Sequence, residues 1–81
     1  MKSFKILGSG CRNCLTTAKL IEEQARKSGM EIQIEKITDM AAILGYGVMS
    51  TPGVVLDGKV VHTGSVPNPN DVAIWLAKQD D

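Results

Sequence analysis

The apolar residues of this chain fall into short runs and helical stripes that predict alternating strands and helices. Residues 4–7 form an apolar run that Lys5 interrupts and glycines end, which is typical of a buried strand. Residues 11–28 carry apolar side chains at helical spacing, with charged side chains largely off that stripe, and this predicts a long helix. The apolar stripe comprises Cys14, Ala18, Ile21 and Ala25, and Leu15 widens it.

The stretch after this helix alternates between apolar and polar residues. Met30, Ile32 and Ile34 are separated by charged or amide side chains, which is the period of a strand with one buried and one solvated face. We expect an edge strand over residues 30–35. It should run parallel to the first strand, because a strand, a helix and a strand in succession form a right-handed crossover. A short helix over residues 38–44 follows, with a Thr-Asp pair available as its N-cap.

The second half of the chain contains a clear hairpin signal. Asp57 and Gly58 lie between two β-branched runs at residues 54–56 and 59–62. An Asp-Gly pair favours a type I′ turn, since both central residues of that turn need positive φ. The last two strands are therefore expected to be antiparallel.

A final helix is predicted to begin with Asn68 as its N-cap and Pro69 at its first position, and to extend through Gln79. The chain then has the order strand, helix, strand, helix, strand, strand, helix, which belongs to the α/β class. No linker or internal repeat divides it. We expect one domain over residues 1–81, a length that suffices for a single core.

Several larger side chains are interpreted as structural rather than chemical. Methionine adapts to irregular gaps in a core, and a lone histidine at a strand end is typical of a surface. The packing groups by this interpretation are Met30, Met40, Met49, Tyr46 and Trp75, and the surface residue is His62.

The charge balance excludes some partners. Nine Lys and Arg residues face nine Asp and Glu residues, so the net charge is zero and no basic surface for nucleic acid or an anionic membrane is expected. The apolar run near the N-terminus is too short for a secretory signal, and no run approaches transmembrane length. We expect a cytoplasmic monomer, in a compartment where reducing conditions disfavour a permanent structural disulfide.

The chemistry is indicated by the two cysteines, Cys11 and Cys14, which are spaced CxxC at the start of the long helix. The first turn of a helix has unpaired N–H groups and carries the positive end of the helix dipole, and both stabilise a thiolate. We therefore expect the pKa of the Cys11 thiol to lie below the ordinary value of about 8.5. Cys11 is thus the predicted nucleophile. Cys14 points toward the core stripe and suits the resolving role. Between them, Arg12 and Asn13 are candidates for tuning that pKa: Arg12 adds positive charge or is simply solvated, and Asn13 adds no charge.

This arrangement predicts a thiol–disulfide oxidoreductase. Cys11 would attack a substrate disulfide to form a mixed disulfide, and Cys14 would then attack Cys11 to release the reduced product. No cofactor is expected beyond the redox-active Cys11–Cys14 disulfide. The expected partners are a protein or small-molecule disulfide and a thiol or reductase that donates electrons.

Two other interpretations of the CxxC pair stay open. The pair could be purely structural, although closing so short a loop stabilises little. It could also bind a soft metal, since two sulfurs suit Cu(I) and two protomers could complete a zinc site. Heavy-metal carrier domains, however, usually have Met two residues before the first cysteine, where this chain has Ser9, and a different order of elements. We assign no metal ligand.

Residues 6–14, residues 46–52 and the Asp57-Gly58 turn together resemble the thioredoxin fold. More narrowly, the chain is similar to the small glutaredoxin-like proteins of bacteria and archaea called the redox-active disulfide protein family. The resemblance covers nearly the whole chain. It implies a minimal βαβαββα domain, a four-stranded mixed sheet with helices on both faces. Thioredoxins also carry a buried carboxylate before the motif, and here Lys5 occupies the corresponding stretch.

The resemblance also implies residues that bind the substrate. In this fold the proline that matches Pro52 is cis and lies beside the cysteines, and the residue before it, here Thr51, pairs with an extended substrate chain. Gly64 and Ser65 would form the opposite wall of the site. Considered alone, Thr51-Pro52-Gly53 would also fit an ordinary turn.

Overall fold

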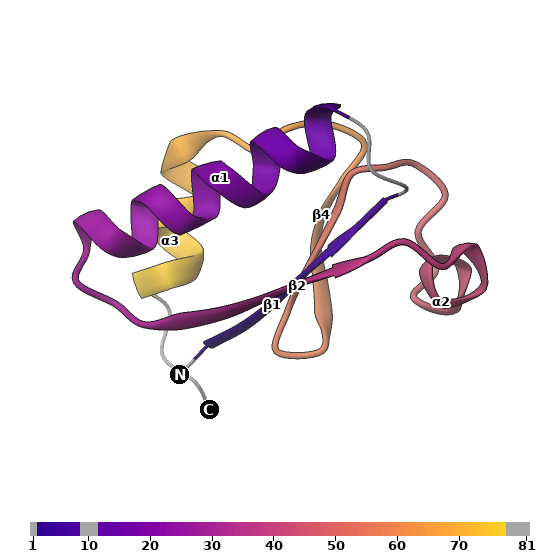
Figure 1. The fold of residues 1–81 in the computed structure, drawn as a ribbon, viewed down its shortest axis with the longest axis horizontal. Helices are drawn as coiled ribbons and strands as arrows, with labels where there is room; N and C mark the ends of the chain where they lie inside the picture. Colours follow the sequence, from indigo (N-terminus) through magenta and orange to yellow (C-terminus); the bar gives the residue numbers. More distant parts are fainter. Residues whose placement is uncertain (1, 9–11, 78–81) are drawn as a thin grey trace.

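The computed structural model of the chain describes residues 2–8 and 12–77. Within these residues the order of elements is the predicted one (Figure 1). The elements are β1 (Lys2–Leu7), α1 (Arg12–Lys27), β2 (Ile32–Ile37), α2 (Met40–Gly45), β3 (Gly53–Leu56), β4 (Lys59–Thr63) and α3 (Pro69–Ala77).

The four strands form a mixed sheet in the order β2-β1-β3-β4. β1 is parallel to β2 and antiparallel to β3, and β3 is antiparallel to β4. This confirms both the parallel pair joined by α1 and the edge position of β2. The four-stranded mixed sheet that the resemblance implied is therefore present.

β2 begins and ends two residues later than the alternation indicated. The N–H of Met30 donates to the carbonyl oxygen of Ala25 at 2.9 Å, and that of Gly29 donates to Arg26 at 3.1 Å. With Gly29 at a φ of 67°, this is a Schellman motif that closes the end of α1. Met30 therefore belongs to the helix cap rather than to the strand, and α1 itself ends at Lys27.

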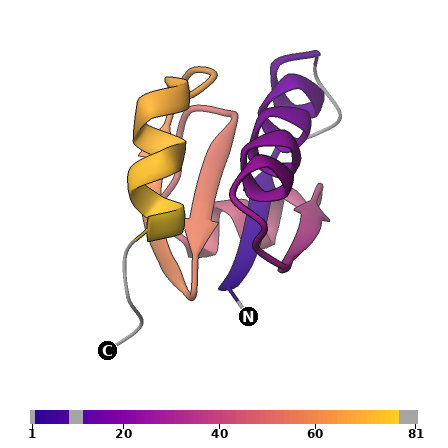
Figure 2. The same cartoon turned by 90° about the vertical axis from the view of Figure 1, so that its left-hand side faces the viewer.

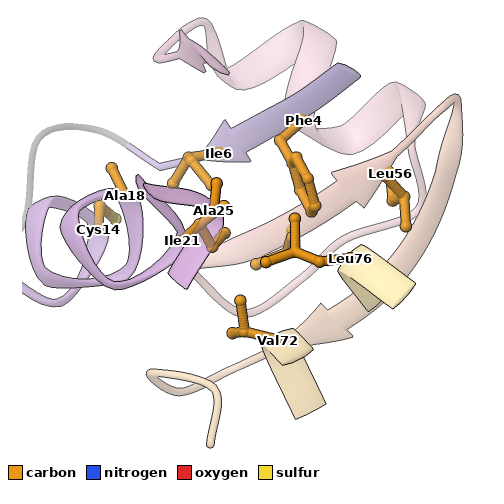
Figure 3. Packing of buried hydrophobic residues seen from close by; sticks show 10 residues of the cluster. Phe4, Ile6, Cys14, Ala18, Ile21, Ala25, Leu56, Val72 and Leu76 are labelled. Carbon is orange, nitrogen blue, oxygen red and sulfur yellow. The ribbon is translucent and has the colours of Figure 1, made fainter. Parts of the chain in front are cut away.

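Helices lie on both faces of the sheet. α1 and α3 lie side by side over one face (Figures 1 and 2). Figure 3 shows how their side chains meet those of the sheet in the larger core, where Cys14 lies beside Ala18. α2 closes a smaller core on the other face. The larger core comprises Phe4, Ile6, Cys14, Ala18, Ile21, Ala25, Val54, Leu56, Val72 and Leu76, and the smaller one Leu7, Ile43, Val48 and Val55.

The buried stripe of α1 differs from the prediction at two positions. Leu15, expected to widen the stripe, is 45% exposed, whereas Thr17 is fully buried. Thr17 follows Cys14 by three residues and precedes Ile21 by four, so it lies on the stripe. Its Oγ1 donates to the carbonyl oxygen of Asn13 at 2.7 Å, and this bond within the helix satisfies the buried hydroxyl.

The hairpin turn has the predicted backbone. Asp57 and Gly58 have φ angles of 49° and 88°, as a type I′ turn requires. Asp57 also holds the turn against β1, because its Oδ1 accepts from the N–H of Ser3 at 2.9 Å and its own N–H donates to the Ser3 carbonyl at 2.8 Å.

The predicted caps of the two shorter helices are also present. Asp39 accepts from the N–H of Ala42 at 3.2 Å at the start of α2, which ends at Gly45, one residue past the predicted end. Asn68 accepts from the N–H of Asn70 at 2.8 Å before α3. The predicted end of α3 at Gln79 lies outside the described residues. None of the helices in residues 2–8 and 12–77 is long and apolar enough to cross a bilayer.

The interpretation of the methionines as core filler is correct for one of three. Met30 is partly buried and packs against the larger core. Met40 is 58% exposed and Met49 is 90% exposed, so neither fills a core. α2 has six residues and buries only Ile43, which leaves the remaining apolar side chains of that segment at the surface.

Candidate active site

The described part of the CxxC motif lies in the first turn of α1. Cys14 is 5% exposed and is disulfide-bonded, while Arg12 and Asn13 are exposed. Cys11, the other cysteine of the chain, lies outside the described residues. The first turn of α1 has no acidic side chain, so no carboxylate neutralises the positive end of the helix dipole there, and the two basic side chains of the last turn interact favourably with its negative end.

Gly8 lies directly against the sulfur of Cys14. Gly8 follows β1, and its N–H donates to the carbonyl oxygen of Ile37 at 2.9 Å. A Cβ built on Gly8 would overlap Cys14 Sγ and would lie 3.5 Å from Thr51 Cβ. Gly8 therefore brings the start of α1 together with the segment before β3. The sequence interpretation gave Gly8 only the role of ending a strand.

Thr51 and Pro52 form the second part of the site. Their peptide bond is cis, the isomer that the resemblance implied. Pro52 is buried, whereas Thr51 is exposed. Because Thr51 and Cys14 both approach Gly8, these residues lie together although they are far apart in the sequence.

The loop after β4 lies against the proline segment. The N–H of Gly64 donates to the carbonyl oxygen of Pro52 at 3.0 Å, and Gly64 has a φ of 88°. Ser65 is exposed, and its Oγ lies 3.1 Å from Nε2 of His62. The His62 ring in turn lies 6.1 Å from the Trp75 ring, centroid to centroid. His62 is half-buried by these contacts rather than being simply a surface residue.

The structure thus gathers most of the predicted site residues. Figure 1 shows the start of α1, the segment before β3 and the loop after β4 at the same end of the molecule. Cys14 and Thr51 both approach Gly8, and a backbone hydrogen bond joins Pro52 to Gly64. No such contact links Arg12 to these residues in the described part of the chain.

Lys5 occupies the stretch where thioredoxins have a carboxylate. Its Nζ lies 3.1 Å from the hydroxyl of Tyr46 and 5.9 Å from the centre of the Tyr46 ring. The hydrogen bond to Tyr46, followed by the charge interaction with the same residue, raises the pKa of Lys5 above the ordinary 10.5. Tyr46 packs against the smaller core, so this pair belongs to the α2 face of the sheet.

The side chains that could bind a metal ion do not cluster in the described residues. Among residues 2–8 and 12–77, the His, Cys, Asp and Glu side chains form no group of three or more that could hold a metal ion. The described part of the structure therefore offers no support for the metal-binding interpretation.

Comparison with known proteins identifies the family. The model of a family described as "Thioredoxin domain" matches residues 2–77. This chain belongs to the thioredoxin family. A thioredoxin from Methanothermobacter thermautotrophicus is 32% identical over 72 residues, which cover 89% of this chain and 94% of that protein. A thioredoxin from Methanocaldococcus jannaschii is 31% identical over 72 residues, covering 89% and 83% of the two chains.

A solved structure agrees with the fold. Thioredoxin-2, a component of the malaria parasite's protein secretion machinery, aligns with a TM-score of 0.71 at 15% identity. The alignment covers 98% of this chain and 84% of that one. The predicted membership of the thioredoxin-fold superfamily and the predicted fold class are confirmed. At the level of the family, the chain is a thiol–disulfide oxidoreductase.

Proposed function

We propose that this thioredoxin-family chain reduces disulfides with Cys11 as nucleophile and Cys14 as resolving thiol. The Cys11 thiolate attacks one sulfur of a substrate disulfide, which forms a mixed disulfide and releases the first substrate thiol. The Cys14 thiolate then attacks Cys11 Sγ, which forms the Cys11–Cys14 disulfide and releases the second substrate thiol. Two electrons pass to the substrate, and an external thiol or a reductase restores the dithiol.

The burial of Cys14 is the observation that carries this division of roles. A side chain that is 5% exposed gives a bulky disulfide little access to its sulfur. It can still react with a neighbouring sulfur of its own chain. Substrates are therefore expected to react first at Cys11, and Cys14 to act on the covalent intermediate.

The start of α1 supports the activation of Cys11. A thiolate there interacts with the positive end of a 16-residue helix whose first turn contains no acidic residue. Arg12, which is exposed next to the nucleophile in the sequence, adds a positive charge that favours the anion. Asn13 brings no charge.

The segment before β3 and the loop after β4 support a place for the substrate. Thr51 is exposed beside Gly8 and Cys14, and it would pair with an extended chain of the substrate. Gly64, which is bonded to Pro52, would form the facing wall together with Ser65.

The test is the reduction of insulin with dithiothreitol as donor, by the wild type, Cys11→Ser and Cys14→Ser. We expect Cys11→Ser to be inactive. In a separate incubation with insulin and without dithiothreitol, reduced Cys14→Ser should accumulate a mixed disulfide with the substrate, visible as an added mass that dithiothreitol then removes. Equal rates of insulin reduction for the three proteins would refute the proposal. Metal analysis gives a second test: stoichiometric Cu or Zn in wild type purified under reducing conditions, together with no disulfide exchange, would also refute it.

A further inference from the structure

We propose that Gly8 is a positioning residue that sets the reduction potential of the cysteine pair, because its missing side chain leaves the space that Cys14 Sγ occupies in the disulfide. This inference rests on the proposed dithiol chemistry. It assigns Gly8 no contact with the substrate. Gly8 would act through the position of the resolving sulfur.

The geometry singles out the sulfur as the point of conflict. A Cβ on Gly8 would overlap Cys14 Sγ, but it would lie 3.5 Å from Cys14 Cβ and 3.5 Å from Thr51 Cβ. The last two distances are ordinary van der Waals contacts. Among the residues that the structure describes, an alanine at position 8 would therefore conflict only with the sulfur.

Gly8 itself has little freedom to move away. Its N–H is bonded to the carbonyl oxygen of Ile37 at the end of β2. It directly follows Leu7, which is fully buried and pairs with both Ile37 and Gly53 in the sheet. The sheet thus fixes Gly8 on one side, and α1 fixes the backbone of Cys14 on the other.

The two redox states differ in how they can relieve this conflict. In the dithiol, Cys14 Sγ is not bonded to Cys11, so a turn about χ1 toward another staggered position can relieve the overlap. In the disulfide, the bond to Cys11 restricts the sulfur to a narrow geometry. An added methyl group at position 8 should therefore destabilise the disulfide more than the dithiol.

The predicted effect is a more oxidising pair. The reaction measured is the protein disulfide plus two glutathione giving the protein dithiol plus glutathione disulfide. We expect Gly8→Ala to raise the equilibrium constant for this reduction by about tenfold, which corresponds to a potential about 30 mV less negative. The matched control is Gly45→Ala, since a Cβ on Gly45 has no neighbouring atom within 4 Å. It should leave the potential unchanged.

A double-mutant cycle tests the same contact by stability, including the case in which Gly8→Ala folds poorly. In the oxidised wild type, Gly8→Ala should lower the free energy of unfolding. With Cys14→Ala, which removes the sulfur, Gly8→Ala should have little effect. Equal losses in both backgrounds would show that position 8 conflicts with something other than Cys14 Sγ and would overturn the inference.

The outcomes separate this inference from the proposed function. A wild type that neither turns over insulin nor shows a dithiol–disulfide transition with glutathione contradicts the proposed function itself. A wild type that does both, alongside a Gly8→Ala variant with the wild-type potential, contradicts only the role of Gly8.

Discussion

The N–H of Gly64 donates a hydrogen bond to the carbonyl oxygen of Pro52 at 3.0 Å. This bond joins the loop after β4 to the segment that precedes β3. It requires Gly64 to adopt a φ of 88°, which L-residues with a side chain rarely adopt. The wall that we propose for the site, formed by Gly64 and Ser65, would therefore depend on one glycine.

Gly64→Ala should both destabilise the protein and slow insulin reduction. Forcing an alanine into the left-handed region costs about 1–2 kcal/mol. The neighbouring atoms leave room for the methyl group, since Ser50 Cβ would lie 3.6 Å away. The loss should therefore come from the backbone. Urea unfolding and the insulin assay measure the two effects.

Gly58→Ala provides the control for Gly64→Ala. Gly58 also has a φ of 88° and free space around its Cβ, but it lies at the hairpin turn, at the opposite end of β3 and β4 from Gly53 and Thr63. Gly58→Ala should lose as much stability as Gly64→Ala and should keep the wild-type rate of insulin reduction. If both variants turned over insulin equally, position 64 would have no special part in the site.

Ile21 and Leu15 should respond very differently to alanine substitution, although both are apolar residues of α1. Ile21 is fully buried in the larger core, so Ile21→Ala should lower the free energy of unfolding by about 2–5 kcal/mol. Leu15 is 45% exposed, so Leu15→Ala should change the free energy of unfolding by less than about 1 kcal/mol. Urea unfolding of both variants decides the matter. Equal losses would contradict the orientation of α1.

The Lys5–Tyr46 pair should make stability depend on pH in the alkaline range. The hydrogen bond to Tyr46 raises the pKa of Lys5 in the folded state, so the charged lysine favours folding. This contribution is fully present below the unfolded value of 10.5 and is lost as pH rises through the folded pKa. Lys5 is only half-buried and solvent still screens its charge, so the effect should be small.

Tyr46→Phe is the direct test of this pair. We expect the Lys5 pKa, followed by NMR of its side-chain Cε, to return toward 10.5 in this variant. An unchanged Lys5 titration would show that Tyr46 is not the cause of the shift.

The sequence predicted best those elements whose signals are local. The Asp57-Gly58 turn follows from the backbone that this pair favours, and the caps at Asp39 and Asn68 follow from side chains that bond to N–H groups two or three residues ahead. The helical stripe of α1 also follows from spacing alone. Each of these features is decided within a few residues.

The errors arose where packing between distant segments decides. Hydrophobicity favoured Leu15 over Thr17 as a buried residue, but the face that α1 turns to the sheet buries Thr17, whose hydroxyl is satisfied within the helix. Met40 lies in the short α2, whose buried residue is Ile43, and Met49 lies in the segment between α2 and β3, and both side chains are exposed.

The approach of Gly8 to Cys14 and Thr51 was also not predicted. It joins the end of β1, the start of α1 and the segment before β3, and no local pattern records such a contact. A glycine that follows a buried strand and precedes the first cysteine of the CxxC motif by three residues was the available signal.

The proposed mechanism depends on ready ionisation of the Cys11 thiol, which directly precedes α1 in the sequence and would be favoured as an anion by the positive end of that helix. The most direct measurement is the rate of alkylation by iodoacetamide as a function of pH, in reduced Cys14→Ser, with reduced Cys11→Ser as the control for the buried Cys14. We expect a midpoint well below the ordinary thiol value of about 8.5 for Cys11 and slow reaction of Cys14 at every pH. A Cys11 midpoint at or above about 8.5 would contradict it.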